Sequence, residues 1–174
     1  EQVFIAKGAK VHEGLDFERR LYIIRKKIEN AVRGSPLKQR SFFYITNLSS
    51  RTLSYKGLLM PSQVERFFID LKSDEIKSAL CLVHSRYSTN TFPTWDRSQP
   101  FRFLAHNGEI NTLRGNINWM RAREGLLAAE SFGKDLKKLY PIIVPGGSDS
   151  AALDNVFELL VLSGHVHLAG RPGV

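Results

Sequence analysis

The sequence of 174 residues is poor in cysteine, with Cys81 as its single example, so no internal disulfide can form. This scarcity fits a reducing compartment, and we expect a cytoplasmic protein. No apolar run reaches the roughly 18–20 residues that span a bilayer, and the opening residues lack the apolar centre of a signal peptide. We therefore expect neither a membrane-spanning nor a disulfide-stapled protein.

Several catalytic signatures are also missing. There is no glycine-rich phosphate loop and no Ser-His pair. His165 and His167 stand two positions apart, but no cysteine or carboxylate cluster accompanies them, so we expect no metal site. Cys81 lies inside the apolar run Ala79–Val83, where we expect a buried and unreactive thiol. The chain thus offers no evident nucleophile.

The remaining composition indicates an ordered globular domain, with 43% hydrophobic and 24% charged residues. A formal charge of +8 raises the question of nucleic-acid binding. However, the tightest basic group alternates with apolar positions of an amphipathic helix; it comprises Arg19, Arg20, Arg25, Lys26 and Lys27. We favour a solvated helix face and expect no nucleic-acid or membrane partner, with docking to a partner domain as the remaining alternative.

Periodicity and turn residues predict four helices, beginning near Asp16, Pro61, Thr112 and Ala151. The first should end near residues 34–36 and the last near residue 162. β-rich runs predict a hairpin over residues 41–56, strands over 79–83 and 101–105, and an extended segment over 141–144. Helices and strands alternate irregularly, which indicates an α+β fold in layers.

Three polar clusters each follow a buried run, around Arg86, Asn107 and Asp149. Strand ends that converge on one edge would bring them together. Arg86 offers a planar fork of donors that matches a carboxylate, although a structural salt bridge would use it equally well. Asp149, in a Gly-Gly-Ser-Asp-Ser turn, either favours a helix start, with Ser148 or Ser150 as the cap, or pairs with a substrate ammonium group.

Asn107 and Gly108 also allow two interpretations. Asn-Gly is a strong hairpin signal. Alternatively, the Asn amide and the Gly backbone N–H are two donors that can stabilise one developing oxyanion. With Arg86 and Asp149 they would clamp an α-amino acid and polarise its side-chain amide, which is the layout of an amide-hydrolysing site.

The run VHSRYSTNTFPTWDRSQPFRFLAHNGEINTLRGNINWMRARE resembles the glutamine amidotransferase domain of the glutamate synthase large subunit. GSDSAALDNVFELLVLSG, FERRLYIIRKKIE and YITNLSSRTLSYKGLL resemble the same family, and the resemblance covers nearly all of residues 3–164. HNGEINTLRGN is its most specific part.

The resemblance implies a partial four-layer αββα N-terminal-nucleophile hydrolase sandwich with antiparallel sheets. It implies that Arg86 and Asp149 bind glutamine and that Asn107 and Gly108 form the oxyanion hole. It also implies attack by a cysteine at the mature N-terminus, whose α-amino group is the base. In the intact enzyme of this family, ammonia passes to an FMN-bearing barrel and adds to 2-oxoglutarate, with an iron–sulfur cluster and NADPH or ferredoxin supplying electrons.

The sequence departs from the family pattern in two places. It contains no counterpart of the nucleophilic cysteine, and from about His165 its tail no longer matches. We therefore expect residues 1–174 to be the central and C-terminal part of a single amidotransferase domain, a fragment that is inactive alone. The alternatives are a non-catalytic domain that binds glutamine or glutamate as a regulator, and a stand-alone glutaminase subunit.

Overall fold

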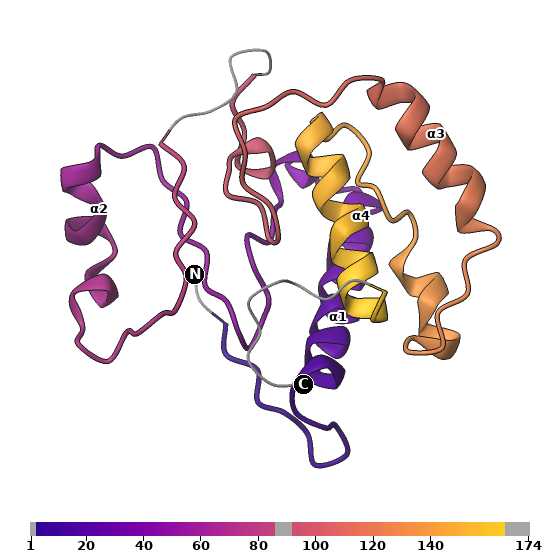
Figure 1. The fold of residues 1–174 in the computed structure, drawn as a ribbon, viewed down its shortest axis with the longest axis horizontal. Coiled ribbons are helices and arrows are strands. Elements are labelled where there is room, and N and C mark those ends of the chain that lie inside the picture. The colour runs from indigo at the N-terminus through magenta and orange to yellow at the C-terminus, as the bar shows by residue number, and fades with distance from the viewer. Residues whose placement is uncertain (1–2, 86–91, 166–174) are drawn as a thin grey trace.

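The computed structural model describes residues 3–85 and 92–165. Its helical elements, in chain order, are α1 (Leu15–Arg33), η1 (Arg40–Phe42), α2 (Pro61–Phe67), η2 (Ile69–Lys72), η3 (Trp95–Arg97), α3 (Leu113–Glu124), η4 (Gly133–Leu139) and α4 (Asp149–Ser163). Helix α1 contacts both α4 and η4, while α2 and α3 lie on opposite flanks of the molecule (Figure 1). None of the described helices is long and apolar enough to cross a membrane.

Helix α1 ends where the sequence predicts, because Gly34 closes it with its N–H on the Asn30 carbonyl at 3.0 Å. Its start differs slightly from the prediction. Gly14, at φ 79°, occupies the N-cap position, and Asp16 lies inside the first turn. There the Asp16 carboxylate accepts from Arg19 at 2.9 Å and is favourably placed in the field of the helix dipole.

The starts of α2 and α4 lie within two residues of the prediction. Helix α2 begins at Pro61, whose fixed φ suits a first helical position. Helix α4 begins at Asp149, and the Ser148 side chain caps it by accepting from the Ala151 N–H at 3.1 Å. Helix α3 begins at Leu113, next to the predicted Thr112, and ends at Glu124.

The core lies where α1, η4 and α4 meet. Its buried members are Tyr22, Ile23, Phe132, Leu136, Leu139, Ile142, Leu159 and Leu162. The inward face of α4 is not purely apolar, and Leu153 and Leu160 on this helix are 42% and 36% exposed. Asp154 and Glu158 point inward instead, and both find buried hydrogen-bond partners.

The prediction of a solvated basic face on α1 is wrong for Arg25 and Lys26, which are only 1% and 2% exposed. Arg25 donates to Glu29 on its own helix at 3.2 Å and also to Glu158 on α4. Because both partners are buried acids, the guanidinium can leave water without remaining unpaired. Arg25 thus pairs with Glu29 within α1 and also joins α1 to α4 through Glu158.

The described residues contain no β-strand, which contradicts the predicted αββα sandwich and its antiparallel sheets. A strand needs a ladder of backbone hydrogen bonds to a neighbour, and here other acceptors take the N–H groups. In the segment 101–105, Phe101 N donates to the Leu104 carbonyl at 2.8 Å and closes a turn. The next two N–H groups donate to the Asp154 carboxylate.

In two other segments where β structure was expected, backbone N–H groups likewise donate to side chains rather than to a neighbouring strand. The backbone N–H of Ile142 donates to the Glu124 carboxylate at 2.7 Å, and that of Val144 to the Asn155 side chain at 2.9 Å. In the predicted hairpin, the Ser50 N–H donates to Glu18 at 2.7 Å. Side chains from helices therefore satisfy backbone groups that the sequence pattern assigned to ladders.

The expectation that Cys81 is buried is also wrong, because its side chain is exposed. Its neighbours Leu80 and Val83 are 74% and 79% exposed. A short apolar run indicates a buried strand only where other elements cover it, and nothing among the described residues covers this one.

Candidate functional site

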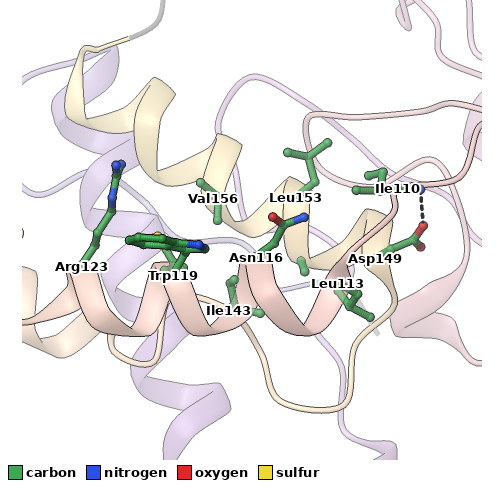
Figure 2. Close-up of a pocket in the computed structure, with 11 residues that line it drawn as sticks. Ile110, Leu113, Asn116, Trp119, Arg123, Ile143, Asp149, Leu153 and Val156 are labelled. Carbon is green, nitrogen blue, oxygen red and sulfur yellow. Dashed lines mark hydrogen bonds between the residues drawn. The ribbon is translucent and has the colours of Figure 1, made fainter.

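Two of the three predicted polar clusters lie together. Asp149, the first residue of α4, accepts the backbone N–H of Ile110 at 2.8 Å through Oδ2, and Figure 2 shows this contact at one end of a pocket. The loop that carries Asn107 and Gly108 is therefore attached to the helix that carries Asp149. Arg86, the third predicted residue, lies outside the described residues.

Asp149 is held as an anion. Partial burial acts to raise the pKa of its carboxyl group, but hydrogen bonds from the backbone N–H groups of Ile110 and Ser150 outweigh burial and lower the pKa below its ordinary value. The Ser150 N–H lies 2.7 Å from Oδ1. A carboxylate that stays ionised at neutral pH suits an ammonium ligand.

His106 links the loop to the helix, a role that the sequence reasoning did not assign. Its Nδ1 accepts from the Gly108 N–H at 3.1 Å, so in the neutral ring Nε2 carries the proton. Nε2 lies 2.7 Å from Ser150 Oγ, which in turn lies 3.3 Å from Asp149 Oδ1. In the sequence, only its position directly before Asn107 could have indicated that His106 belongs to the candidate site.

Asn107 is exposed, and its side-chain oxygen lies 2.7 Å from His84 Nε2. Because an amide oxygen only accepts, His84 donates in this pair. The Asn107 NH₂ group has no hydrogen-bond partner within residues 3–85 and 92–165. It is the donor that the predicted oxyanion role requires.

Gly108 is exposed too, but its N–H is already used by His106. A Cβ on this residue would lie 3.3 Å from His106 Nδ1, a tight contact that favours glycine. For Gly108 to polarise a substrate carbonyl, its N–H must leave the histidine ring. The two-donor oxyanion hole therefore stays a prediction.

A cavity of about 400 Å³ lies between α3 and α4. Asp149 and Arg123 lie at its opposite ends, with apolar side chains between them (Figure 2). Its walls consist of Ile110, Leu113, Asn116, Trp119, Met120, Arg123, Ile143, Asp149, Ala152, Leu153 and Val156. Asn107 and Gly108 are not among them, so this cavity does not contain the two predicted oxyanion donors.

A buried ionic cluster lies where α1 and α4 meet. Glu29 accepts from Arg25 on α1 and from Arg102, whose terminal nitrogen lies 3.4 Å away. Arg102 also donates to the Ile45 carbonyl, and Arg25 donates to Glu158. Arg102 attaches the 102–110 segment to Glu29 on α1, while Glu158 links α4 to Arg25. The cluster was not predicted, because its members are far apart in the sequence.

We assign no metal ligands. Within the described part of the chain, no three His, Cys, Asp or Glu side chains are grouped so that they could hold a metal ion.

A family model for the class II glutamine amidotransferases matches residues 1–170. The chain therefore belongs to the class II glutamine amidotransferases. This confirms the family that the HNGEINTLRGN run indicates.

The relatives are glutamate synthases. The chain is 56% identical over 163 residues to the glutamate synthase [NADPH] large chain of Bacillus subtilis (strain 168). The matched region covers 94% of this chain and 10% of the relative. It is 55% identical over 152 residues to the glutamate synthase [NADH] of Schizosaccharomyces pombe, covering 87% and 7%. For the chloroplastic ferredoxin-dependent glutamate synthase of Oryza sativa subsp. japonica, the identity is 44% over 164 residues, covering 94% and 10%. The chain thus spans a tenth or less of the length of these relatives.

Proposed function

We propose that this chain supplies the substrate-binding and amide-polarising groups of a glutaminase that converts L-glutamine to glutamate and ammonia. The observation that carries the proposal is the attachment of the Asn107–Gly108 loop to an ionised Asp149. An anion for the ammonium group and amide donors for the side-chain carbonyl then belong to one local structure.

In this proposal Asp149 pairs with the α-ammonium group of glutamine and Arg86 with its α-carboxylate. Asn107 and Gly108 donate to the side-chain carbonyl oxygen as it becomes negative. A cysteine thiolate, which the family resemblance places at the mature N-terminus, attacks the amide carbon and its α-amino group takes up the thiol proton. The α-amino group passes this proton to the departing nitrogen, so that ammonia leaves and a thioester remains. Water then cleaves the thioester to give glutamate and the free thiol.

The proposal extends to the whole protein through its relatives. Ammonia would pass to a synthase domain, of the same or a partner chain, that bears FMN and an iron–sulfur cluster, and there add to 2-oxoglutarate. The names of the relatives include NADPH, NADH and ferredoxin, so the electron donor stays open. We also propose that residues 1–174 alone do not turn over glutamine, because none of the assigned residues is a nucleophile. A cytoplasmic location likewise stays a prediction.

Steady-state kinetics of the protein as its gene encodes it test the roles. Asp149→Asn removes the charge and should raise KM for glutamine, as should Arg86→Ala. Asn107→Ala should lower kcat by about 10²–10³-fold, the usual effect of losing one oxyanion donor. Asp135→Asn, on the distant η4, is the control and should change neither constant. If the three site variants leave both constants unchanged, the assignment is wrong.

Labelling with a reactive glutamine analogue, followed by peptide mapping, distinguishes the alternatives. An adduct on a cysteine at the mature N-terminus that glutamine suppresses supports the glutaminase. An adduct on the exposed Cys81 would assign the nucleophile to this residue instead. Glutamine binding without any adduct would favour the regulatory domain, and the length of the natural gene product separates a synthase from a stand-alone glutaminase subunit.

A further inference from the structure

Asp154 is a buried acid that the proposed reaction does not use. It is 1% exposed, and no ion pair joins it to any residue of the described ranges. Burial, followed by repulsion from Glu158, raises its pKa to about 6, while the backbone N–H of Phe103 and the charge and backbone N–H of Arg102 act in the opposite direction. A buried charge without an ion pair is costly, and hydrogen bonds must compensate for it.

The compensation comes from the loop. Asp154 Oδ1 accepts the Phe103 N–H at 2.8 Å, and Oδ2 accepts the Arg102 N–H at 3.3 Å. Both donors belong to the turn that Phe101 and Leu104 close, a few residues before Asn107. Asp154 therefore holds the backbone that leads directly into the site.

The neighbouring residues of α4 hold the same loop further along. Ser150, one turn before Asp154, lies 2.7 Å from the His106 ring, and Asp149 holds the Ile110 N–H at 2.8 Å. The first turns of one helix thus contact the loop before and after Asn107 and Gly108. The three contacts fix the loop relative to Asp149.

We propose that Asp154 is a positioning residue that sets where Asn107 and Gly108 stand relative to the substrate held by Asp149. This inference rests on the proposed function and adds a residue that touches no substrate. A displacement of about 1 Å at a reacting centre lowers rates by about 10²-fold, so the placement of the loop affects turnover more than binding. Asp149 keeps its own anchor, the helix that Ser148 caps.

Asp154→Asn is the test variant, and Glu158→Gln is its matched control. The Asn side chain keeps the size of Asp but turns an NH₂ group toward one of the two backbone donors. Glu158 is a buried acid one turn further along α4, 5% exposed, and it bonds Arg25 rather than the loop. Both variants remove a buried carboxylate from one helix, so an effect confined to Asp154→Asn reports on the loop.

The first readout is glutaminase kinetics of the protein as its gene encodes it. Asp154→Asn should lower kcat by about 10–100-fold with little change in KM, while Glu158→Gln should keep kcat within about twofold. Equal losses in the two variants would overturn the inference, because they would reflect a general loss of stability. If Asp154→Asn does not fold, Asp154→Glu, which keeps both acceptors but shifts them by one methylene, takes its place with the same expected split between kcat and KM.

The second readout is amide hydrogen exchange over residues 101–110, which does not require activity. Asp154→Asn should speed exchange in this segment by about tenfold, the effect of losing one hydrogen bond, and Glu158→Gln should not. If the unsubstituted protein shows no glutaminase activity, the proposed function fails and exchange alone decides the role of Asp154. Unchanged exchange in Asp154→Asn overturns that role.

Discussion

Lys26 shows how a single residue couples the packing of this molecule to pH. The residue is 2% exposed, and its ammonium group donates to the carbonyls of Pro141 and Ile142, the latter at 3.2 Å. Burial, followed by repulsion from Arg25, lowers the pKa of Lys26 from 10.5 to about 8. The folded chain therefore releases this proton more readily than the unfolded chain does.

We expect the free energy of unfolding to rise between pH 8 and 10. Below pH 8 both states keep the Lys26 proton, whereas above it only the unfolded state does, so stability rises with pH in this window. The full shift corresponds to a gain on the order of 3 kcal/mol, measured as urea unfolding at several pH values.

Lys26→Met should remove about half of the total slope, because Lys56 has a similarly lowered pKa, and Lys27→Met, which changes the exposed neighbour, should leave the slope intact. A slope of similar size should remain from Lys56, whose pKa burial also lowers to about 8. A slope that is unchanged in Lys26→Met would contradict the prediction.

At the scale of the element, helix starts carry a measurable share of the stability. Ser148 is buried and caps α4 through the Ala151 N–H. Ser148→Ala should lower the free energy of unfolding by about 1 kcal/mol, the usual cost of losing a cap. Ser62→Ala, in the exposed first turn of α2, is the control and should lower it by less than half as much. Equal losses in denaturant titrations would contradict the capping role.

Helix ends were predictable from the sequence because their signals are local. Gly34 and Pro61 each act through their own backbone, and their effect does not depend on the rest of the chain. Asp149 was placed at a helix start for the same reason, since a Ser-Asp-Ser turn marks such a start, while its role in a site stays a prediction. Asn107 and Gly108 were proposed because an Asn amide and a Gly N–H can donate to one oxygen, and the family resemblance implies the same role.

The sheet and the burial pattern were not predictable in this way, because they depend on distant partners. Residues 101–105 have the composition of a strand, but Asp154, some fifty positions away, takes two of their N–H groups. Arg25 has the appearance of a surface charge until Glu158 is placed beside it. His106 was missed because its link to Ser150 likewise exists only in the folded chain.

At the scale of the whole molecule, apolar exposure is concentrated between residues 42 and 83. The large apolar residues with the highest exposed fraction in this stretch are Phe42, Leu53, Leu58, Met60, Phe67, Ile69, Leu80 and Val83. The core, in contrast, lies where α1, η4 and α4 meet. Apolar surface left in water favours association.

We therefore expect the 174-residue chain to associate as its concentration rises, measured by sedimentation velocity. The double variant Leu58→Ser and Phe67→Ser should shift the chain toward monomer. Leu126→Ser is the control, because this residue is 87% exposed but lies beyond α3. A monodisperse monomer of high thermal stability would contradict the prediction.

Acidic side chains that accept hydrogen bonds from loop N–H groups also affect how this chain can associate. A loop with free N–H groups is a template on which a second chain can build cross-β structure. Glu18, Glu124 and Asp154 already occupy such groups with charged acceptors, which bind more strongly than the carbonyls of an incoming strand. Association of this chain should therefore proceed through side chains and give assemblies that do not stain with amyloid dyes.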